Sequence, residues 1–135
     1  MVGTWAENTE DAHVELSCRW TTNQNFLLLS YRVVRDEAVD FQVSQIIGWD
    51  PQKQVIRSWQ FDSDGGYGVG RWKATSDGWS VQTRQVLQDG RNAAATYFYD
   101  RPADDRLRFR SLGREIEGEL VEDIEPLELG RVSED

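Results

Sequence analysis

The sequence has little of what builds metal and redox sites: its 135 residues include one cysteine, Cys18, and one histidine, His13. A single cysteine excludes an intrachain disulfide. Cys18 alternates with Leu16 and Trp20 on one face of an expected strand, which favours a buried structural thiol. His13 would point to the opposite face, so the two residues are not placed to ligate zinc or to support histidine-based catalysis. We therefore expect no metal, no cofactor and no catalytic residue.

Basic charge is also scarce. Lysine and arginine total 15 against 24 aspartates and glutamates, which gives a net charge of −9. Nucleic acids and anionic membrane surfaces both attract proteins through a basic face, so we expect neither as a partner. No apolar run approaches the roughly 18–20 residues of a membrane span. The first residues, MVGTWAENTED, lack the basic and apolar regions of a signal peptide. We expect none in this chain and take the cytoplasm as the default location, while the compartment of any longer parent protein stays open.

Helical periodicity is missing as well, and alternation with a period of two takes its place. Val14, Leu16, Cys18 and Trp20 alternate with other residues, and similar runs recur with turn signals such as WDPQKQ, DSDGG and LQDG between them. Antiparallel strands joined by such turns form a meander, and closing the meander into a barrel removes its exposed edges. We therefore expect residues 1–135 to form one all-β domain, an antiparallel up-and-down meander barrel of about 8–10 strands.

The acid-rich segment GREIEGELVEDIEPLE, residues 113–128, is the exception to the alternation. Its pattern fits a short helix, a strand with a bulge, or a loop that crosses the barrel mouth. The sequence leaves these three alternatives open.

The stretch IRSWQFDSDGGYGVGRW, residues 56–72, raises the question of an ion site. Asp62 and Asp64 resemble the opening of a calcium loop. Counting from Asp62, however, the fifth, sixth and twelfth positions lack the residues that an EF-hand requires. The stretch predicts a hairpin turn, with a looser ion site as the weaker alternative.

Gly66, Gly68 and Gly70 leave one face of the strand after this turn without side chains. A bare face of this kind usually marks the close approach of another group. We expect Trp59 or Trp72 to pack there rather than a ligand.

Six tryptophans are many for a chain of this size. A row of them could form a stacking platform for a flat ligand, but we expect most to fill the barrel core and its ends. Trp49 and Trp79 lie beside turns, so we expect these two to be partly exposed.

Gly3, Thr4 and Trp5 resemble the Gly-x-Trp signature that opens the first barrel strand of lipocalins and related calycin folds. In that family the tryptophan closes one end of the barrel, and an arginine of the last strand lies across its ring. The resemblance implies this closing role for Gly3, Trp5 and Arg131, with a cation–π contact worth about 0.5–2 kcal/mol.

A wider run, from the first tryptophan through NFLL and IIGWDPQKQVIRSWQFDSDGGYGVGRW to VLQDGRNAAAT, resembles the lipocalin-like domain that bacterial proteins carry behind a SnoaL-like domain. The SnoaL-like half is absent from this chain, so no activity of that half is carried over. By analogy, the resemblance implies small hydrophobic molecules as the class of ligand.

These features predict a non-enzymatic binding module that holds a small hydrophobic or aromatic ligand inside the barrel. The predicted ligand-binding wall consists of four residues on adjacent expected strands: Arg57, Trp59, Tyr67 and Trp72. The first alternative is a structural barrel that packs on a partner domain or self-associates as a homodimer. The second is a carboxylate-based enzyme in the barrel mouth, which would require an inward-facing acid with a raised pKa.

Overall fold

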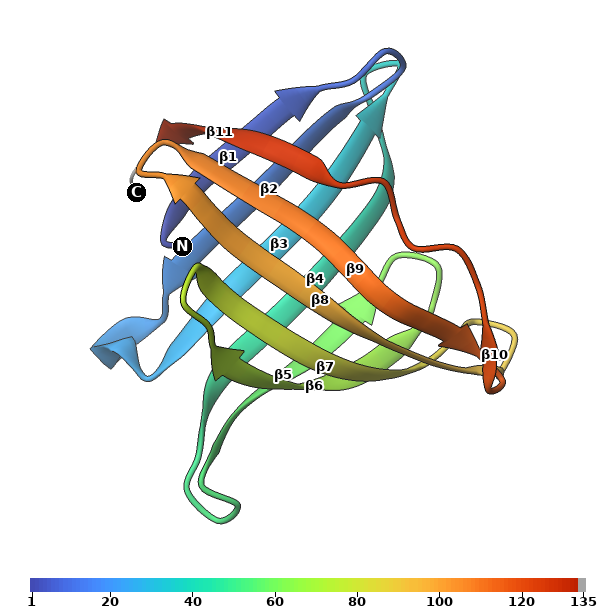
Figure 1. Ribbon diagram of the computed structural model, residues 1–135. Coiled ribbons are helices and arrows are strands. Elements are labelled where there is room, and N and C mark those ends of the chain that lie inside the picture. The colour runs from blue at the N-terminus through green and yellow to red at the C-terminus, as the bar shows by residue number, and fades with distance from the viewer. Residues whose placement is uncertain (134–135) are drawn as a thin grey trace.

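A computed structural model describes residues 1–133 as one sheet wrapped into a barrel (Figure 1). The sheet contains eleven strands, and a short 3-10 helix links the second strand to the third. In chain order the elements are β1 (Gly3–Asn8), β2 (His13–Trp20), η1 (Thr22–Gln24), β3 (Phe26–Arg35), β4 (Ala38–Asp50), β5 (Val55–Asp62), β6 (Tyr67–Ala74), β7 (Gly78–Val86), β8 (Asn92–Ala103), β9 (Arg106–Ile116), β10 (Glu119–Leu120) and β11 (Leu127–Ser133).

Strands that follow one another in sequence are hydrogen-bonded neighbours from β1 to β9, as in a meander. The strand β11 pairs with both β9 and β1, so ten strands form a closed ring, while β10 pairs only with the end of β9. These pairings confirm the all-β, up-and-down barrel and the number of strands expected from the sequence. Closure pairs both edges of the sheet, which would otherwise expose rows of free backbone groups.

The turn between β5 and β6 confirms the predicted hairpin. Asp62 accepts hydrogen bonds from the backbone N–H groups of Asp64 and Gly66, at 2.9 and 3.0 Å. Gly65 has a φ of +101°, a conformation that residues with a side chain rarely adopt. The carboxylate of Asp62 therefore holds the turn itself together.

One end of the barrel is closed around Trp5, where β1 begins and β11 ends (Figure 1). The indole is fully buried, and its Nε1 donates a hydrogen bond to the Met1 carbonyl at 3.0 Å. Arg131 is paired with Trp5 across the two strands, and its guanidinium carbon lies 4.2 Å from the ring centroid. Arg131 also donates to the Val2 carbonyl at 3.1 Å, so one cation ties the last strand to the start of the chain.

Apolar side chains fill the barrel interior behind Trp5. Trp72 stacks on Tyr99 there, with ring centroids 5.1 Å apart. Burial raises the pKa of the Cys18 thiol to about 11, which confirms the buried thiol expected from the sequence. The buried apolar core comprises Trp5, Val14, Leu16, Cys18, Leu29, Ile47, Trp72, Val81, Tyr99, Leu107 and Leu129.

Two of the six tryptophans belong to this buried core, Trp5 and Trp72. Trp49 is 55% exposed, as expected beside its turn, and Trp79 is partly buried against the core. Trp20, at the end of β2, is 46% exposed, and Trp59 lies on the outer face of β5, outside the core and the barrel ends where most indoles were expected. Alternation along a strand defines two faces, but it does not say which of them is inside.

The acid-rich segment 113–128 combines a short hairpin with an extended loop. A turn after Ile116 leads into β10, and an extended stretch then returns to β11. Ser111 on β9 anchors this stretch, because its Oγ accepts a hydrogen bond from the Ile124 backbone N–H at 2.9 Å. The segment contains no helix, and its returning stretch borders the barrel mouth. Of the three expected alternatives, the loop that crosses the barrel mouth is the closest to this structure.

Trp5→Ala would remove the largest fully buried side chain and leave a hole at the closed end. We expect the free energy of unfolding, measured by urea denaturation, to fall by about 3–5 kcal/mol. Trp49→Ala is the matched control because that indole is 55% exposed, and it should change stability by about 0.5 kcal/mol or less. Equal losses in the two variants would contradict the closing role of Trp5.

Candidate functional site

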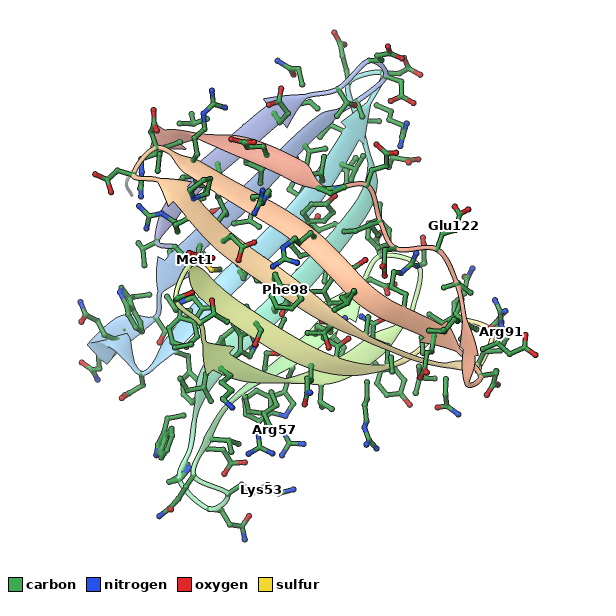
Figure 2. All side chains as sticks on the ribbon, in the orientation of Figure 1. Met1, Lys53, Arg57, Arg91, Phe98 and Glu122 are labelled. Atoms are coloured by element: carbon green, nitrogen blue, oxygen red, sulfur yellow. The ribbon has the colours of Figure 1, made fainter. Side chains whose placement is uncertain are left out.

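The end of the barrel opposite Trp5 is hollow. A cavity of about 520 Å³ lies there, and its lining reaches the β5–β6 and β7–β8 turns. The stretch between β10 and β11 borders it through Ile124 and Glu125. In Figure 2, Met1 lies toward the closed end and Arg91 at the open end. A barrel of this strand number can hold one small ligand where its interior is not filled by side chains.

One wall of the cavity is aromatic. The rings of Tyr97 and Phe109 stack with centroids 5.4 Å apart and an interplanar angle of 6°. Tyr31 and Tyr99 extend this wall, with ring centroids 6.1 and 4.9 Å from that of Phe109. The four rings, which we call the aromatic wall, offer an apolar surface to a flat molecule.

A second wall carries carboxamides. Gln45 on β4 is paired with Gln60 on β5, Gln60 is paired with Gly68 on β6, and Gly68 is paired with Gln85 on β7. All three glutamines line the cavity, and we call them the glutamine row. Gln45 and Gln60 are only 9% and 7% exposed, so their amides are withdrawn from bulk water.

The glycines of β6 make room for this second wall. A Cβ atom at Gly68 would lie 2.9 Å from Gln85 Cγ, so the missing side chain lets Gln85 approach β6 closely. A Cβ at Gly70 would lie 2.5 Å from Ser58 Oγ. The bare face therefore admits close neighbours, as its pattern indicated. The expectation that a tryptophan packs there was wrong, because polar and aliphatic groups occupy the space.

Charged side chains of the cavity lie in turns or toward strand ends, at its mouth. They are the acids Asp62, Asp64, Asp89 and Glu125 and the cations Arg91 and Arg114. Because acids outnumber cations, the entrance favours neutral or cationic molecules over anions. Hydrogen bonds from Arg91, first of all from its backbone N–H, lower the pKa of Asp89. The enzymatic alternative needs an acid whose pKa is shifted upward, and Asp89 is shifted the other way.

The four residues predicted as the ligand-binding wall lie outside this cavity: Arg57, Trp59, Tyr67 and Trp72. The first three lie on the outer face of β5 and β6, and Figure 2 shows Arg57 outside the barrel. Trp72 does point inward, but it is packed in the core. The alternation along β5 was predicted correctly, yet its inner face holds Ser58 and Gln60 rather than the indole.

The outer face of β3–β6 carries an apolar patch. Cross-strand pairing places Leu28, Ile46, Trp59 and Val69 in one row and Phe61 beside Tyr67 in the next, and we call these six residues the outer patch. Ile46, Phe61 and Tyr67 are 42%, 60% and 54% exposed. The guanidinium carbon of Arg57 lies 5.5 Å from the Trp59 ring centroid, at the border of the patch.

Across residues 1–133, no group of three or more His, Cys, Asp or Glu side chains is placed to hold a metal ion. The same part of the chain has no helix that is long and apolar enough to span a bilayer. A scan against protein-family models and a search of curated proteins found no match. Fold and cavity therefore define the class of this protein: a closed antiparallel β-barrel of ten strands with one solid and one hollow end.

The aromatic wall predicts a loss of stability at alkaline pH. Burial raises the pKa of Tyr31, Tyr97 and Tyr99 above the ordinary tyrosine value. In the unfolded chain these hydroxyls ionise near pH 10, whereas the folded state keeps them protonated. Their contribution to stability is therefore complete below about pH 10 and is lost as the pH rises further.

Urea denaturation at about pH 8 and about pH 11 should show this decline, and Tyr97→Phe should make it smaller. A free energy of unfolding that stays constant over this range would contradict the burial of the phenols. So would a decline of the same size in Tyr97→Phe.

Proposed function

We propose that the protein is a non-enzymatic binding module that holds one small aromatic ligand in the open end of its barrel. The observation that carries the proposal is a cavity of about 520 Å³ beside a stacked aromatic wall. Ligand pockets usually span about 300–1,000 Å³ and combine apolar and aromatic lining with a few placed polar groups. The stacked rings of Tyr97 and Phe109 give an aromatic ligand ring partners in the lining of the cavity.

The resemblance to lipocalins supports the same function. Trp5 and Arg131 are in contact, as the closing pair of that family is, and the cavity lies at the opposite end of the barrel. Lipocalins bind small hydrophobic molecules, and we extend that ligand class to this chain by analogy. Kinship with the lipocalin-like domains that accompany SnoaL-like domains is part of this proposal.

Val43→Trp tests the proposal by filling the cavity. Val43 lines the cavity from β4, whereas the next residue, Ser44, is exposed on the outer face, so Ser44→Trp is the matched control. The neutral probe N-phenyl-1-naphthylamine fluoresces more strongly in apolar surroundings. We expect wild type and Ser44→Trp to bind it with similar affinity, and Val43→Trp to bind it about tenfold or more weakly.

Circular dichroism of both variants establishes that the comparison is made between folded proteins. Absence of binding by wild type, or equal affinity in the two folded variants, would contradict a ligand site in this cavity.

The outer patch favours a second candidate function, self-association. Monomeric proteins rarely expose large contiguous apolar surfaces, and the outer patch extends over four neighbouring strands. At its border Arg57 is paired with Arg71 across β5 and β6, and its guanidinium forms an ion pair with Asp50, whose Oδ2 lies 3.5 Å from Arg57 Nη1. A second copy of this chain would bring the same apolar residues, so that each patch would cover the other.

For this second function we expect sedimentation velocity to give a dimer for wild type and a monomer for Phe61→Lys, which places a charge in the outer patch. Val132→Lys is the control, because Val132 is 67% exposed but lies outside the patch, and this variant should stay dimeric. A wild-type protein that remains monomeric up to about millimolar concentration would rule out the homodimer.

A further inference from the structure

The glutamine row has hydrogen-bonding capacity that the protein itself leaves unused. Each carboxamide can donate two hydrogen bonds and accept two. Gln45 Nε2 approaches the Tyr99 hydroxyl at 3.5 Å, a long distance for a hydrogen bond, and within residues 1–133 this is the one side-chain bond that the row makes. None of the amide atoms of the row is fully buried without a partner, so the amides face the cavity, where water or a ligand bonds to them.

The chemistry of that partner is constrained by the charges around the row. The charged group nearest to the row along β5 is Asp62, which follows Gln60 on the inward face of the strand and also lines the cavity. An anionic ligand group placed against these amides would lose its hydration and would be repelled by the Asp62 carboxylate. A neutral group that offers a hydrogen-bond acceptor beside a donor matches a carboxamide, because an amide oxygen and an amide N–H can then bond to it together.

We infer that the ligand is a neutral, planar aromatic molecule with a carbonyl and an N–H or O–H group side by side on one edge. Its ring face lies on the aromatic wall, and its polar edge meets the glutamine row. This inference rests on the proposed function and narrows the ligand class. Plain hydrocarbons and fatty-acid anions should bind more weakly than such a molecule.

A matched pair of probes tests it. 6(5H)-Phenanthridinone and phenanthrene share one tricyclic shape, but only the first carries a lactam. In an apolar cavity the hydrocarbon would bind more tightly, because it loses no hydrogen bonds to water. We expect the lactam to displace N-phenyl-1-naphthylamine from wild type at about tenfold or more lower concentration than phenanthrene does.

Equal or tighter binding of phenanthrene would overturn the inference and leave the proposed binding function standing. Failure of the naphthylamine and of both tricycles to bind would overturn the two together. The outcomes of the two proposals are thus distinguishable in one set of titrations.

Gln60→Met assigns the effect to the row, because it keeps the length of the side chain and removes its hydrogen bonds. We expect its affinity for phenanthridinone to fall about tenfold and its affinity for phenanthrene to stay or rise. Gln82→Met is the matched control, since Gln82 is exposed on the outer face of β7. If Gln60→Met does not fold, Gln85→Met gives the same measurement from the other side of Gly68. Unchanged lactam affinity in the folded variant would overturn the inference.

Discussion

The pairing of β11 with β1 is the constraint on which the rest of the barrel depends. Until the last strand joins the first, the sheet has two free edges. Side chains that alternate along a strand then lie on two faces, neither of which is enclosed. Closure gives all ten strands of the ring a common interior. Arg131 takes part in this closure in two ways, because its guanidinium covers the Trp5 ring and also bonds to the Val2 carbonyl. The cation–π contact is worth about 0.5–2 kcal/mol. Because it joins the two strands that close the barrel, it stabilises the pairing on which the closed ring depends.

The two ends of the barrel differ because side-chain volume changes along single strands. On β6 the inward positions run from Gly68 through Gly70 to Trp72 as the chain passes from the open end toward the closed end. The same strand therefore helps to fill the core and to leave the cavity hollow. The glycines also let Gln85 and Ser58 come close to the backbone of β6, which widens the space on their other side. Close packing with these neighbours leaves no room for a side chain at either glycine position.

The sequence predicts the fold far better than the site, and β5 shows why. Its alternation gives two faces, one with Trp59 and the other with Ser58 and Gln60. Hydrophobicity alone predicts that the face with the indole points into the barrel. The structure has the reverse arrangement, because the inward face of β6 carries glycines and admits small or polar neighbours. The glutamine row was missed for a related reason: Gln60 and Gln85 become neighbours of one row only through the pairing with Gly68. Contacts such as Gln45 with Tyr99 join strands that are far apart in sequence, so local periodicity carries no signal for them.

The polarity of β5 connects the two candidate functions. Its inner face buries Gln60 at 7% exposure, whereas its outer face leaves Phe61 60% exposed. Turning an amide toward the interior costs free energy that an apolar side chain would not, and a phenylalanine left in water forgoes about 1.5–3 kcal/mol of burial. Exchanging the two residue types would remove both costs while preserving the strand and its alternation, so the fold alone does not explain the arrangement. Each cost disappears when the face in question is occupied: a ligand with polar groups would satisfy the amide, and a protein surface would cover the ring. Strand β5 is therefore better suited to a barrel that is occupied inside and covered outside than to an empty, isolated one.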